Sequence, residues 1–377
     1  MTILNQQNPS NILKIALFAT GLAGIVAEYV LSTLASYFLG DSVVQWTMIL
    51  STMLFSMGLG SRISKFITKN LLEHLIFIEF TLSILTSLSS LYVYALAAYT
   101  DYVGFFIYLL GALVGLLIGL EIPLVTRINE DYESLRVNIA AVMEKDYYGS
   151  LVGGAFFAFV GLPYLGITYT PFVLGSLNFL VAVWLYISLR KLVFPSTIKW
   201  INISLFFVTV MLVSGLIFAK PIVLYGEQKK YKDQVIFVQQ SAYQKIVVTQ
   251  WKNNYWLFIN GNQQLCTLDE HLYHEPLVLP AMELAQRAEN VLVLGGGDGC
   301  AVREVLKYSS VQKITLVDLD PMMTDLGKND PIFVAFNKNS MNDPKVKIFN
   351  QDGFQFLEQT EDFYDVIIVD LPDPKSI

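Results

Sequence analysis

Charge, cysteine and histidine are all scarce in this sequence. Only 15% of its 377 residues are charged and 54% are hydrophobic, against about 25% charged in an ordinary soluble protein. This composition excludes a disordered chain and a plain water-soluble globule. The two cysteines, Cys266 and Cys300, and the three histidines predict neither a disulfide framework nor a metal site. The net charge of −7 argues against a nucleic acid as partner, because phosphate binding needs a basic face.

The few charges are unevenly distributed along the chain. Residues 1–220 contain 11 Lys+Arg and 11 Asp+Glu, whereas the remaining 157 residues contain 14 and 21. This shift predicts a multi-pass transmembrane domain over 1–220, with the lipid bilayer as a partner, followed by an acidic soluble part.

Seven apolar stretches in the first part are long enough, or nearly so, to cross the roughly 30 Å of hydrocarbon in a bilayer. The first is too long for a signal peptide and lacks a cleavage pattern. We therefore expect about seven membrane-spanning helices, at 13–39, 43–60, 75–98, 103–125, 148–167, 170–189 and 200–219.

Basic residues occur in alternate loops between these stretches. They follow the second, fourth and sixth stretches, whereas the loops around Asp41, around Asp101 and at 166–170 contain no Lys or Arg. The positive-inside rule then places the N-terminus in the cytoplasm and, after seven crossings, the acidic part outside.

Three glutamates, Glu28, Glu79 and Glu121, lie within the apolar stretches, where a charge is costly and often functional. One interpretation is a polar path or binding site for a cation. The other is that they lie in the bundle interior, paired or protonated, or near an interface.

A small antiparallel β domain is predicted over 221–275, after a polar exit from the membrane at 220–232. Short alternating runs separated by turn residues are typical of β-hairpins. The runs lie at 235–238, 245–251 and 255–260, and a helical pattern follows at 271–288.

A strand, a glycine-rich turn and a helix follow one another at 291–307, which begins a Rossmann-like domain over 276–377. Further strands are predicted at 314–319, 346–349 and 366–369. Acidic residues recur at the carboxyl ends of these strands, where open α/β sheets bind ligands. The expected fold class is therefore a membrane α-helical bundle plus an α/β domain of the S-adenosylmethionine methyltransferase type.

The glycine-rich turn carries a carboxylate, Asp298, which would repel the pyrophosphate of a dinucleotide. Asp318 follows about 20 residues later, where an acidic side chain accepts hydrogen bonds from both ribose hydroxyls. A nucleoside with a cationic tail fits both residues, as in S-adenosylmethionine or its decarboxylated form.

The order of these motifs resembles that of spermidine synthases, the polyamine aminopropyltransferases. The membrane part also looks like the N-terminal extension of a bacterial subgroup, so the resemblance covers nearly the whole chain. It rests on the residues at 241–244, 260–264, 269–275, 295–299, 303–305, 317–320, 352–354 and 370–374, and on 35–42 and 119–123 in the membrane part.

The resemblance implies a reaction and a role for each matching residue. The family moves an aminopropyl group from decarboxylated S-adenosylmethionine to putrescine, which gives spermidine and 5′-methylthioadenosine without a cofactor. Asp370 would orient the attacking amine and accept its proton. The resemblance further implies donor binding by Gln244, Asp298, Asp318 and Asp352, close backbone approach to the donor at Gly295, Gly297 and Gly299, and polyamine binding by Gln264, Tyr273, His274 and Asp373.

Other interpretations stay open. Asp298 would cap a helix, Asp352 would serve as a turn residue, and His274 would only pack. An S-adenosylmethionine-dependent methyltransferase shares the sheet and the ribose-binding acid. A membrane polyamine transporter or sensor with a degenerate enzyme domain would account for the intramembrane glutamates.

The end of the sequence departs most from the family pattern. The chain stops at Ile377, seven residues beyond Asp370, after only four strands. We therefore expect a C-terminally truncated sheet and doubtful activity. Because the substrates are cytoplasmic metabolites, we expect a cell-membrane protein with a cytoplasmic catalytic domain, one of whose seven segments does not cross fully, and a homo-oligomer.

Overall fold

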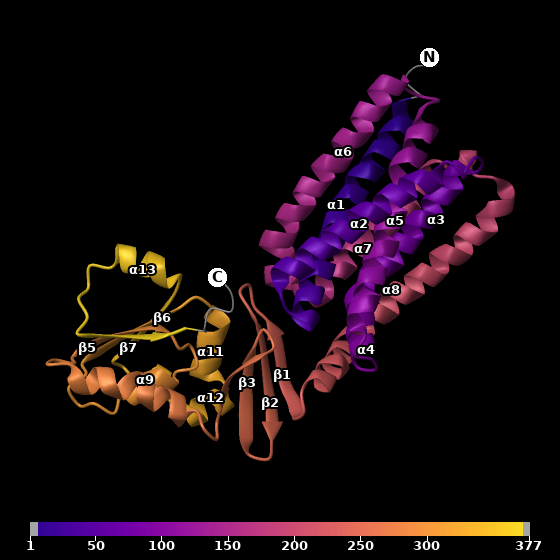
Figure 1. Ribbon diagram of the computed structural model, residues 1–377. Coiled ribbons are helices and arrows are strands. Elements are labelled where there is room, and N and C mark those ends of the chain that lie inside the picture. Colours follow the sequence, from indigo (N-terminus) through magenta and orange to yellow (C-terminus); the bar gives the residue numbers. More distant parts are fainter. Residues whose placement is uncertain (1–6, 372–377) are drawn as a thin grey trace. The chain divides into compact units, whose positions relative to one another are not determined.

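The computed structural model describes residues 7–371. The chain divides into two compact units, and the boundary between them lies between Lys232 and Asp233. The first unit is helical (Figure 1). Its elements are α1 (Gln7–Leu39), α2 (Ser42–Ser64), α3 (Leu71–Ser87), α4 (Ser89–Ala97), α5 (Val103–Asn129), α6 (Leu135–Phe156), the π-helix η1 (Phe157–Leu165), α7 (Gly166–Ser188), the short η2 (Arg190–Leu192) and α8 (Pro195–Lys230).

Glycines allow the helix backbones of this unit to approach closely. A Cβ atom at Gly119 of α5 would lie 2.1 Å from the backbone oxygen of Met57 in α2, and one at Gly149 of α6 would lie 2.0 Å from that of Phe18 in α1. Neither position leaves room for a side chain. Small residues at such contacts are typical of helix packing in membranes.

Five helical stretches of the described chain are long and apolar enough to cross a membrane, and the pair α3–α4, bent by 47°, would make a sixth. One of the five, Leu135–Ser188, has 54 residues. A straight helix of that length would span about 81 Å, far more than a bilayer core. The stretch instead reverses at Gly166, whose φ of 65° breaks the helix.

The reversal is visible in the packing against α1. Gly149 and Gly153 of α6 contact Phe18 and Leu22, so α6 runs parallel to α1. In α7 the order is opposite. Its first turns share a core cluster with the later part of α1, and its last turns, near Leu185, share one with the beginning of α1. The structure therefore separates the two stretches that the sequence placed at 148–167 and 170–189.

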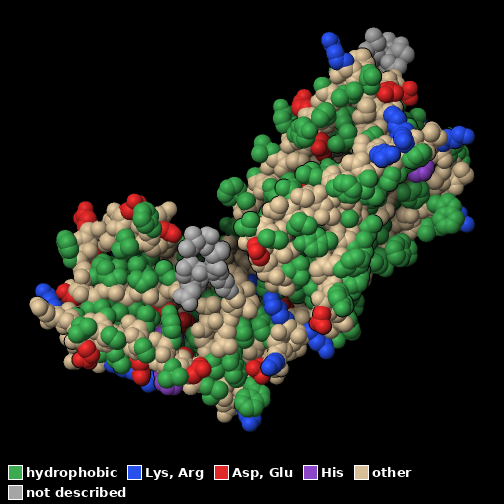
Figure 2. All heavy atoms as spheres, in the orientation of Figure 1, with side chains coloured by type: hydrophobic (Ala, Val, Ile, Leu, Met, Phe, Trp, Pro, Cys, Tyr) green, Lys and Arg blue, Asp and Glu red, His purple; other side chains and the backbone are tan. Residues whose placement is uncertain are grey.

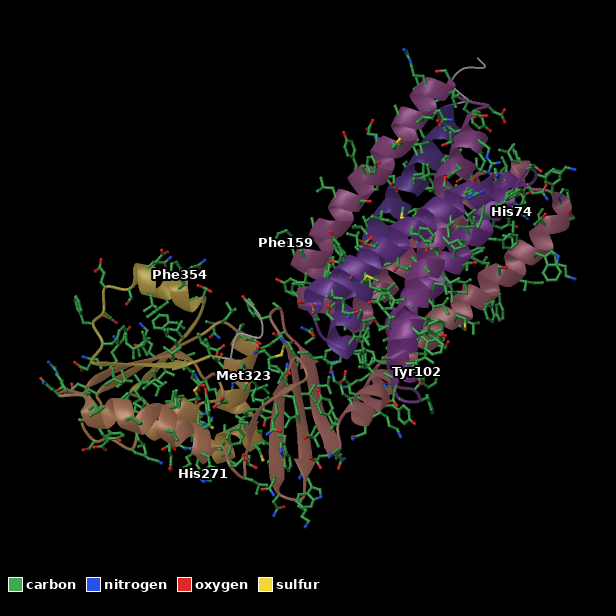
Figure 3. The ribbon with its side chains drawn as sticks, viewed as in Figure 1. His74, Tyr102, Phe159, His271, Met323 and Phe354 are labelled. Atoms are coloured by element: carbon green, nitrogen blue, oxygen red, sulfur yellow. The ribbon has the colours of Figure 1, made fainter. Side chains whose placement is uncertain are left out.

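The contacts also define two ends of the helical unit. At one end Lys14 pairs with Glu133, and Arg127 donates to the backbone oxygen of Ser64 at 2.8 Å. We call it the basic end, because the Lys and Arg residues that follow α2, α5 and α7 lie there. At the opposite end the Tyr37 hydroxyl donates to Glu227 of α8 at 2.7 Å. Figure 3 shows His74 and Tyr102 near the two ends.

One expectation about this unit is corrected. The polar exit predicted at 220–232 is mostly helical, because α8 continues through Pro221 to Lys230, and Glu227 is fully buried. The bent pair α3–α4 begins at the basic end, where Glu73 accepts from the backbone N–H of Phe194, and ends at the opposite end, where Tyr94 contacts Gly226. The pair therefore extends from one end of the helical unit to the other, and the expectation that one segment does not cross fully stays a prediction.

The flanks of the helical unit expose apolar side chains. Phe55, Phe159 and Phe206 are 68%, 76% and 72% exposed, and hydrophobic side chains cover much of the visible face (Figure 2). Phe159 points away from the helices (Figure 3). Such a surface exceeds what water-exposed proteins display and suits contact with lipid.

The second unit begins with an antiparallel sheet in the order β1-β2-β3-β4. Tight turns join the last three strands, with Lys252 and Asn260 at positive φ. The strands are β1 (Gln234–Gln240), β2 (Lys245–Trp251), β3 (Asn254–Ile259) and β4 (Asn262–Cys266).

A parallel sheet in the order β7-β6-β5-β8 follows. Its strands are β5 (Asn290–Gly295), β6 (Lys313–Asp318), β7 (Val346–Asn350) and β8 (Val366–Asp370), and its helices are α9 (His271–Leu284), α10 (Cys300–Val305), α11 (Pro321–Asn329), α12 (Pro331–Phe336), the short η3 (Ser340–Asn342) and α13 (Gly353–Gln359). The chain runs from β5 outward to β7 and returns to β8 on the other side of β5. The carboxyl ends of β5 and β8 therefore form the switch point at which such sheets bind ligands.

Candidate active site

The glycine-rich turn lies at the carboxyl end of β5 and touches two aspartates. A Cβ atom at Gly297 would lie 2.7 Å from Oδ2 of Asp318, and one at Gly295 would lie 2.0 Å from the backbone oxygen of Asp370. Gly295 and Gly299 also adopt positive φ. The turn therefore needs glycine both for its conformation and for its approach to the neighbouring strands.

Asp318 ends β6, and its carboxylate is held by the backbone. Oδ2 accepts from the N–H of Gly297 at 2.9 Å, and Oδ1 accepts from the N–H of Asp320 at 2.8 Å. Burial raises the pKa of Asp318, while these two hydrogen bonds oppose the rise. The side chain is thus fixed beside the glycine turn.

Asp370 ends β8 and pairs in register with Gly295 of β5. Its Oδ1 accepts from the Tyr273 hydroxyl at 2.9 Å, and its Oδ2 lies 3.9 Å from Nε2 of His274 without a hydrogen bond. Burial, reinforced by the charge of Asp298, raises the pKa of Asp370 to about 6, against the opposing effect of His274 and Tyr273. At neutral pH this group is mostly ionised and ready to accept a proton.

His274 belongs to a chain of ionisable groups. Its Nδ1 lies 2.8 Å from Oε2 of Glu270, whose two oxygens accept from the guanidinium of Arg303 at 2.8 and 2.9 Å. Burial works against ionised Glu270, but the hydrogen bonds and charge of Arg303 outweigh it and hold the pKa of Glu270 below its ordinary value. The structure therefore orients the His274 ring from one side and presents its other nitrogen to Asp370.

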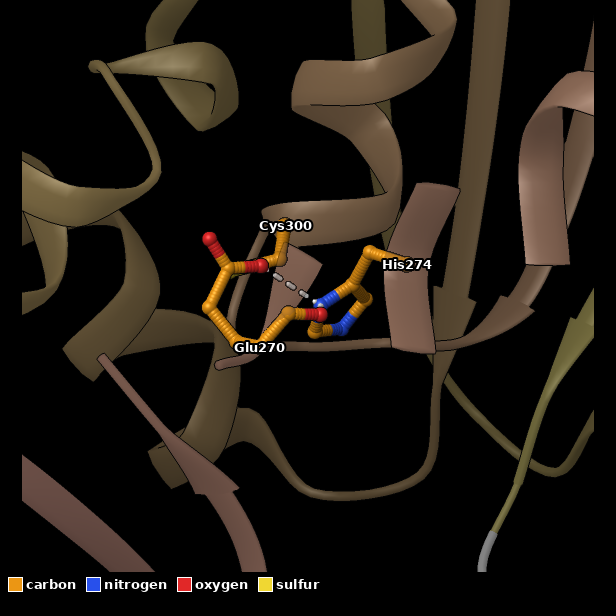
Figure 4. A group of neighbouring side chains, drawn as sticks. All are labelled: Glu270, His274 and Cys300. Carbon is orange, nitrogen blue, oxygen red and sulfur yellow. Dashed lines mark hydrogen bonds and ion pairs between the residues drawn. The ribbon is translucent and has the colours of Figure 1, made fainter. Parts of the chain in front are cut away.

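Two groups of potential metal ligands overlap here. Glu270, His274 and Cys300 lie together (Figure 4), as do His274, Asp298 and Asp370. In the first group the Glu270 carboxylate is already engaged by Arg303. Burial also raises the pKa of the Cys300 thiol well above its ordinary value, and a thiol that stays protonated is a poor ligand. The expectation of no metal remains a prediction.

The remaining residues that the resemblance assigned to substrate binding differ in their exposure and in their hydrogen bonds. Asp298 Oδ1 accepts from the N–H of Cys300 at 2.7 Å, which is the capping contact that the sequence left open. Asp352 is exposed and caps α13 through the N–H of Gln355. Gln264 is exposed on β4. Asp373 lies outside the described residues.

Gln244 is half-buried in a turn that is tied to the Rossmann-like sheet. The Ser241 hydroxyl donates to Asp320 Oδ2 at 2.7 Å and accepts from the N–H of Gln244 at 3.0 Å. This contact links the turn after β1 to Asp320, which lies two residues after the end of β6.

The sequence assigned no roles to Glu270 and Arg303. One signal was present, because Glu270 precedes His274 by four residues and such a pair shares a helix face. The contact with Arg303 spans 33 residues, so only the folded structure reveals it.

Comparison with known proteins confirms the family that the motifs suggested. A family model described as "Spermine/spermidine synthase domain" matches residues 270–377. The chain is 42% identical over 368 residues to "Polyamine aminopropyltransferase 2" of Aquifex aeolicus, which covers 97% of this chain and 73% of that protein. It is 39% identical over 375 residues to "Polyamine aminopropyltransferase" of Oceanobacillus iheyensis, with 96% and 72% covered. Both matches therefore include the helical unit.

Among solved structures, spermidine synthase from Thermotoga maritima is similar with 30% sequence identity. The match covers 36% of this chain and 48% of that chain, with a TM-score of 0.34.

Proposed function

Because this chain belongs to the polyamine aminopropyltransferase family, we propose that it transfers an aminopropyl group from decarboxylated S-adenosylmethionine to putrescine, giving spermidine and 5′-methylthioadenosine. The observation that carries this proposal is the position of Asp370. Its carboxylate, half hydrogen-bonded and half free, lies at the switch point beside the glycine turn.

The reaction needs a free amine. The nitrogen lone pair of putrescine attacks the carbon next to the sulfonium, the new C–N bond forms, and the C–S bond breaks to leave a neutral thioether. Amines have pKa values of about 10 and are protonated near neutral pH. Asp370 binds the ammonium and takes its proton through the free Oδ2, while Tyr273 holds Oδ1.

The donor needs binding and alignment rather than activation, because a sulfonium is already a good leaving group. We assign Asp318 to the ribose hydroxyls, Asp298 to the donor ammonium and Asp352 to the adenine. The glycines of the turn allow the donor to approach the backbone. Gln244 completes the donor side, and Gln264, Tyr273, His274 and Asp373 the polyamine side.

The test is a product assay on the purified chain. With decarboxylated S-adenosylmethionine and putrescine we expect equal amounts of spermidine and 5′-methylthioadenosine. With S-adenosylmethionine the rate should fall, because the donor carboxylate would face Asp298. Release of S-adenosylhomocysteine would instead support the methyltransferase alternative, and absence of any product would contradict both.

We also propose that the helical unit spans a membrane with its basic end in the cytoplasm. Apolar flanks and the clustering of Lys and Arg at one end support this. Because α8 ends opposite the basic end, the chain then leaves the membrane on the non-cytoplasmic side. This contradicts the cytoplasmic catalytic domain that the substrates favour.

Thiol labelling decides between these two locations. Both native cysteines are buried, so the background is low. Cysteine introduced at Lys191, at the basic end, should resist a membrane-impermeant maleimide in intact cells. Cysteine at Lys307 in the second unit reacts if that unit lies outside and is protected if it lies in the cytoplasm. Labelling at Lys191 would overturn the proposed orientation.

A further inference from the structure

Three carboxyl groups from three helices meet inside the helical unit. Glu79 of α3, Glu121 of α5 and Asp146 of α6 are 0%, 1% and 9% exposed. The Thr20 hydroxyl of α1 donates to Oε1 of Glu79 at 2.9 Å. Oδ1 of Asp146 lies over the next residue, Gly21, where a Cβ atom would be 2.9 Å away.

Three of the six carboxyl oxygens in this cluster lack a hydrogen bond within the described residues. Within the described residues, both carboxylate oxygens of Glu121 and Oε2 of Glu79 are buried without a hydrogen bond. The charged groups that interact with Glu121 are Glu79 and Asp146, which are also acidic. Burying unpaired like charges is strongly unfavourable, so something must neutralise them.

The same face of α3 carries further polar groups. Ser83 and Ser87 follow Glu79 at intervals of four residues, which places all three on one face of the helix. Both serine hydroxyls are fully buried without a hydrogen bond, as is Oδ1 of Asn178 on α7. Gly175 of α7 packs directly against Ser87. Unpartnered polar groups thus extend from the carboxylates toward the end of the bundle opposite the basic end.

We propose that Glu79, Glu121 and Asp146 form a binding site inside the helical unit for a small monovalent cation, either a proton or an alkali-metal ion. The cation neutralises the carboxylates and occupies the oxygens that lack partners. This site is separate from the aminopropyltransferase site and does not depend on it, since its residues belong to the other unit.

Infrared spectroscopy of the full chain in lipid bilayers tests the proposal. The probes are pH, and NaCl against choline chloride at equal ionic strength. We expect a protonated-carboxyl band that titrates with pH in the wild type and loses intensity in Glu121→Gln. The matched control, Glu144→Gln, removes an exposed carboxylate of α6 and should leave the band unchanged.

The two cations give different results. If NaCl weakens the band relative to choline chloride, Na⁺ displaces the proton and the site accepts an alkali-metal ion. If the band responds to pH alone, the site is a proton site. Identical wild-type and Glu121→Gln spectra at every pH and salt would overturn the proposal. Glu79→Gln, which keeps an acceptor for Thr20, gives a second variant should Glu121→Gln fail to elute as folded protein.

Discussion

Acids with little exposure to solvent occur in both units. Glu73 and Glu227 of the helical unit accept hydrogen bonds, so the sharpest contrast is between the acids of the α/β unit and Glu121. In the α/β unit Glu270 accepts two hydrogen bonds from Arg303, and Asp318 accepts two from backbone N–H groups. In the helical unit both oxygens of Glu121 lack a hydrogen bond of normal geometry among the described residues, and the nearby Thr20 hydroxyl donates to Glu79 instead. A buried carboxylate with fixed donors stays charged and points in one direction, whereas one without donors must obtain its neutralising partner from elsewhere.

Asp370 stands between these extremes. One oxygen accepts from Tyr273, and the other has no hydrogen bond within residues 7–371. Because only one oxygen is hydrogen-bonded, the Asp370 carboxylate is oriented as that of Asp318 is, and its second oxygen remains available to accept a hydrogen bond from substrate. The comparison therefore predicts where loss of a carboxylate harms chemistry, where it harms stability and where it harms neither.

The largest effect is expected when Asp370 is replaced. Asp370→Asn keeps the shape but removes the proton acceptor, so kcat for spermidine formation should fall by about 10²–10⁴-fold. Donor binding measured by calorimetry should change little. Asp362→Asn, which removes an exposed carboxylate, is the control. A rate within threefold of wild type would show that Asp370 is not the base.

The next effect is expected on stability. Arg303→Met removes both guanidinium hydrogen bonds from the half-buried Glu270 and leaves His274 as its partner. The loss of these charged hydrogen bonds should destabilise the α/β unit by about 1.5–3 kcal/mol. Hydrogen exchange at α9 and α10 measures this locally. Arg287→Met removes a guanidinium that is 63% exposed and should have almost no effect. Equal protection in both variants would mean that the Arg303 contact contributes nothing.

The affinity for the donor should fall when Asp318 is replaced. Asp318→Asn replaces a charged acceptor and weakens its hydrogen bonds to the ribose, which costs about 1.5–3 kcal/mol, or roughly 10- to 150-fold in Kd. Calorimetric titration with 5′-methylthioadenosine measures the change. Unaltered affinity would remove Asp318 from the donor site.

Activity and stability should respond to pH in opposite directions. Because Asp370 must be ionised to accept a proton and its pKa is about 6, kcat/KM should fall about tenfold per pH unit below that value. The pKa lies above the ordinary value of 3.8, so the folded state binds the proton more tightly and its stability should rise as pH falls from about 6 toward 4. A profile flat down to pH 5 would contradict the assignment.

The smallest effect is expected in the helical unit. Glu121→Gln removes an acid without donors, so stability should change by no more than about 1 kcal/mol and toward greater stability. Thermal unfolding in detergent measures it. A large loss of stability would show that Glu121 has a partner, and the contrast between the two units would then fail.

The strand-end acids were predictable because their signal is local. A short apolar run followed by Asp318 or Asp370 indicates both the strand and its carboxyl end. The hydrogen-bond chain from Arg303 through Glu270 to His274 was not predictable, because it depends on how α9 docks against α10.

The polar exit expected at 220–232 shows a different reason for error. Proline usually ends a helix, and lysines near Pro221 suggested a linker. The apolar residues that follow and the buried Glu227 pack against the bundle, and this tertiary contact keeps α8 helical. Asp352 caps α13 in the structure, and its assignment to the adenine stays a prediction.

The register of β5 and β8 has a consequence for how this enzyme family can diversify. Gly295 and Asp370 are paired neighbours on adjacent parallel strands, so backbone hydrogen bonds fix the spacing between the glycine turn and Asp370. Insertions or substitutions in the β3–β4 hairpin or the surface loops leave that distance untouched. If Gln264 on β4 contacts the polyamine as proposed, acceptor preference can be engineered there without moving Gly295 relative to Asp370.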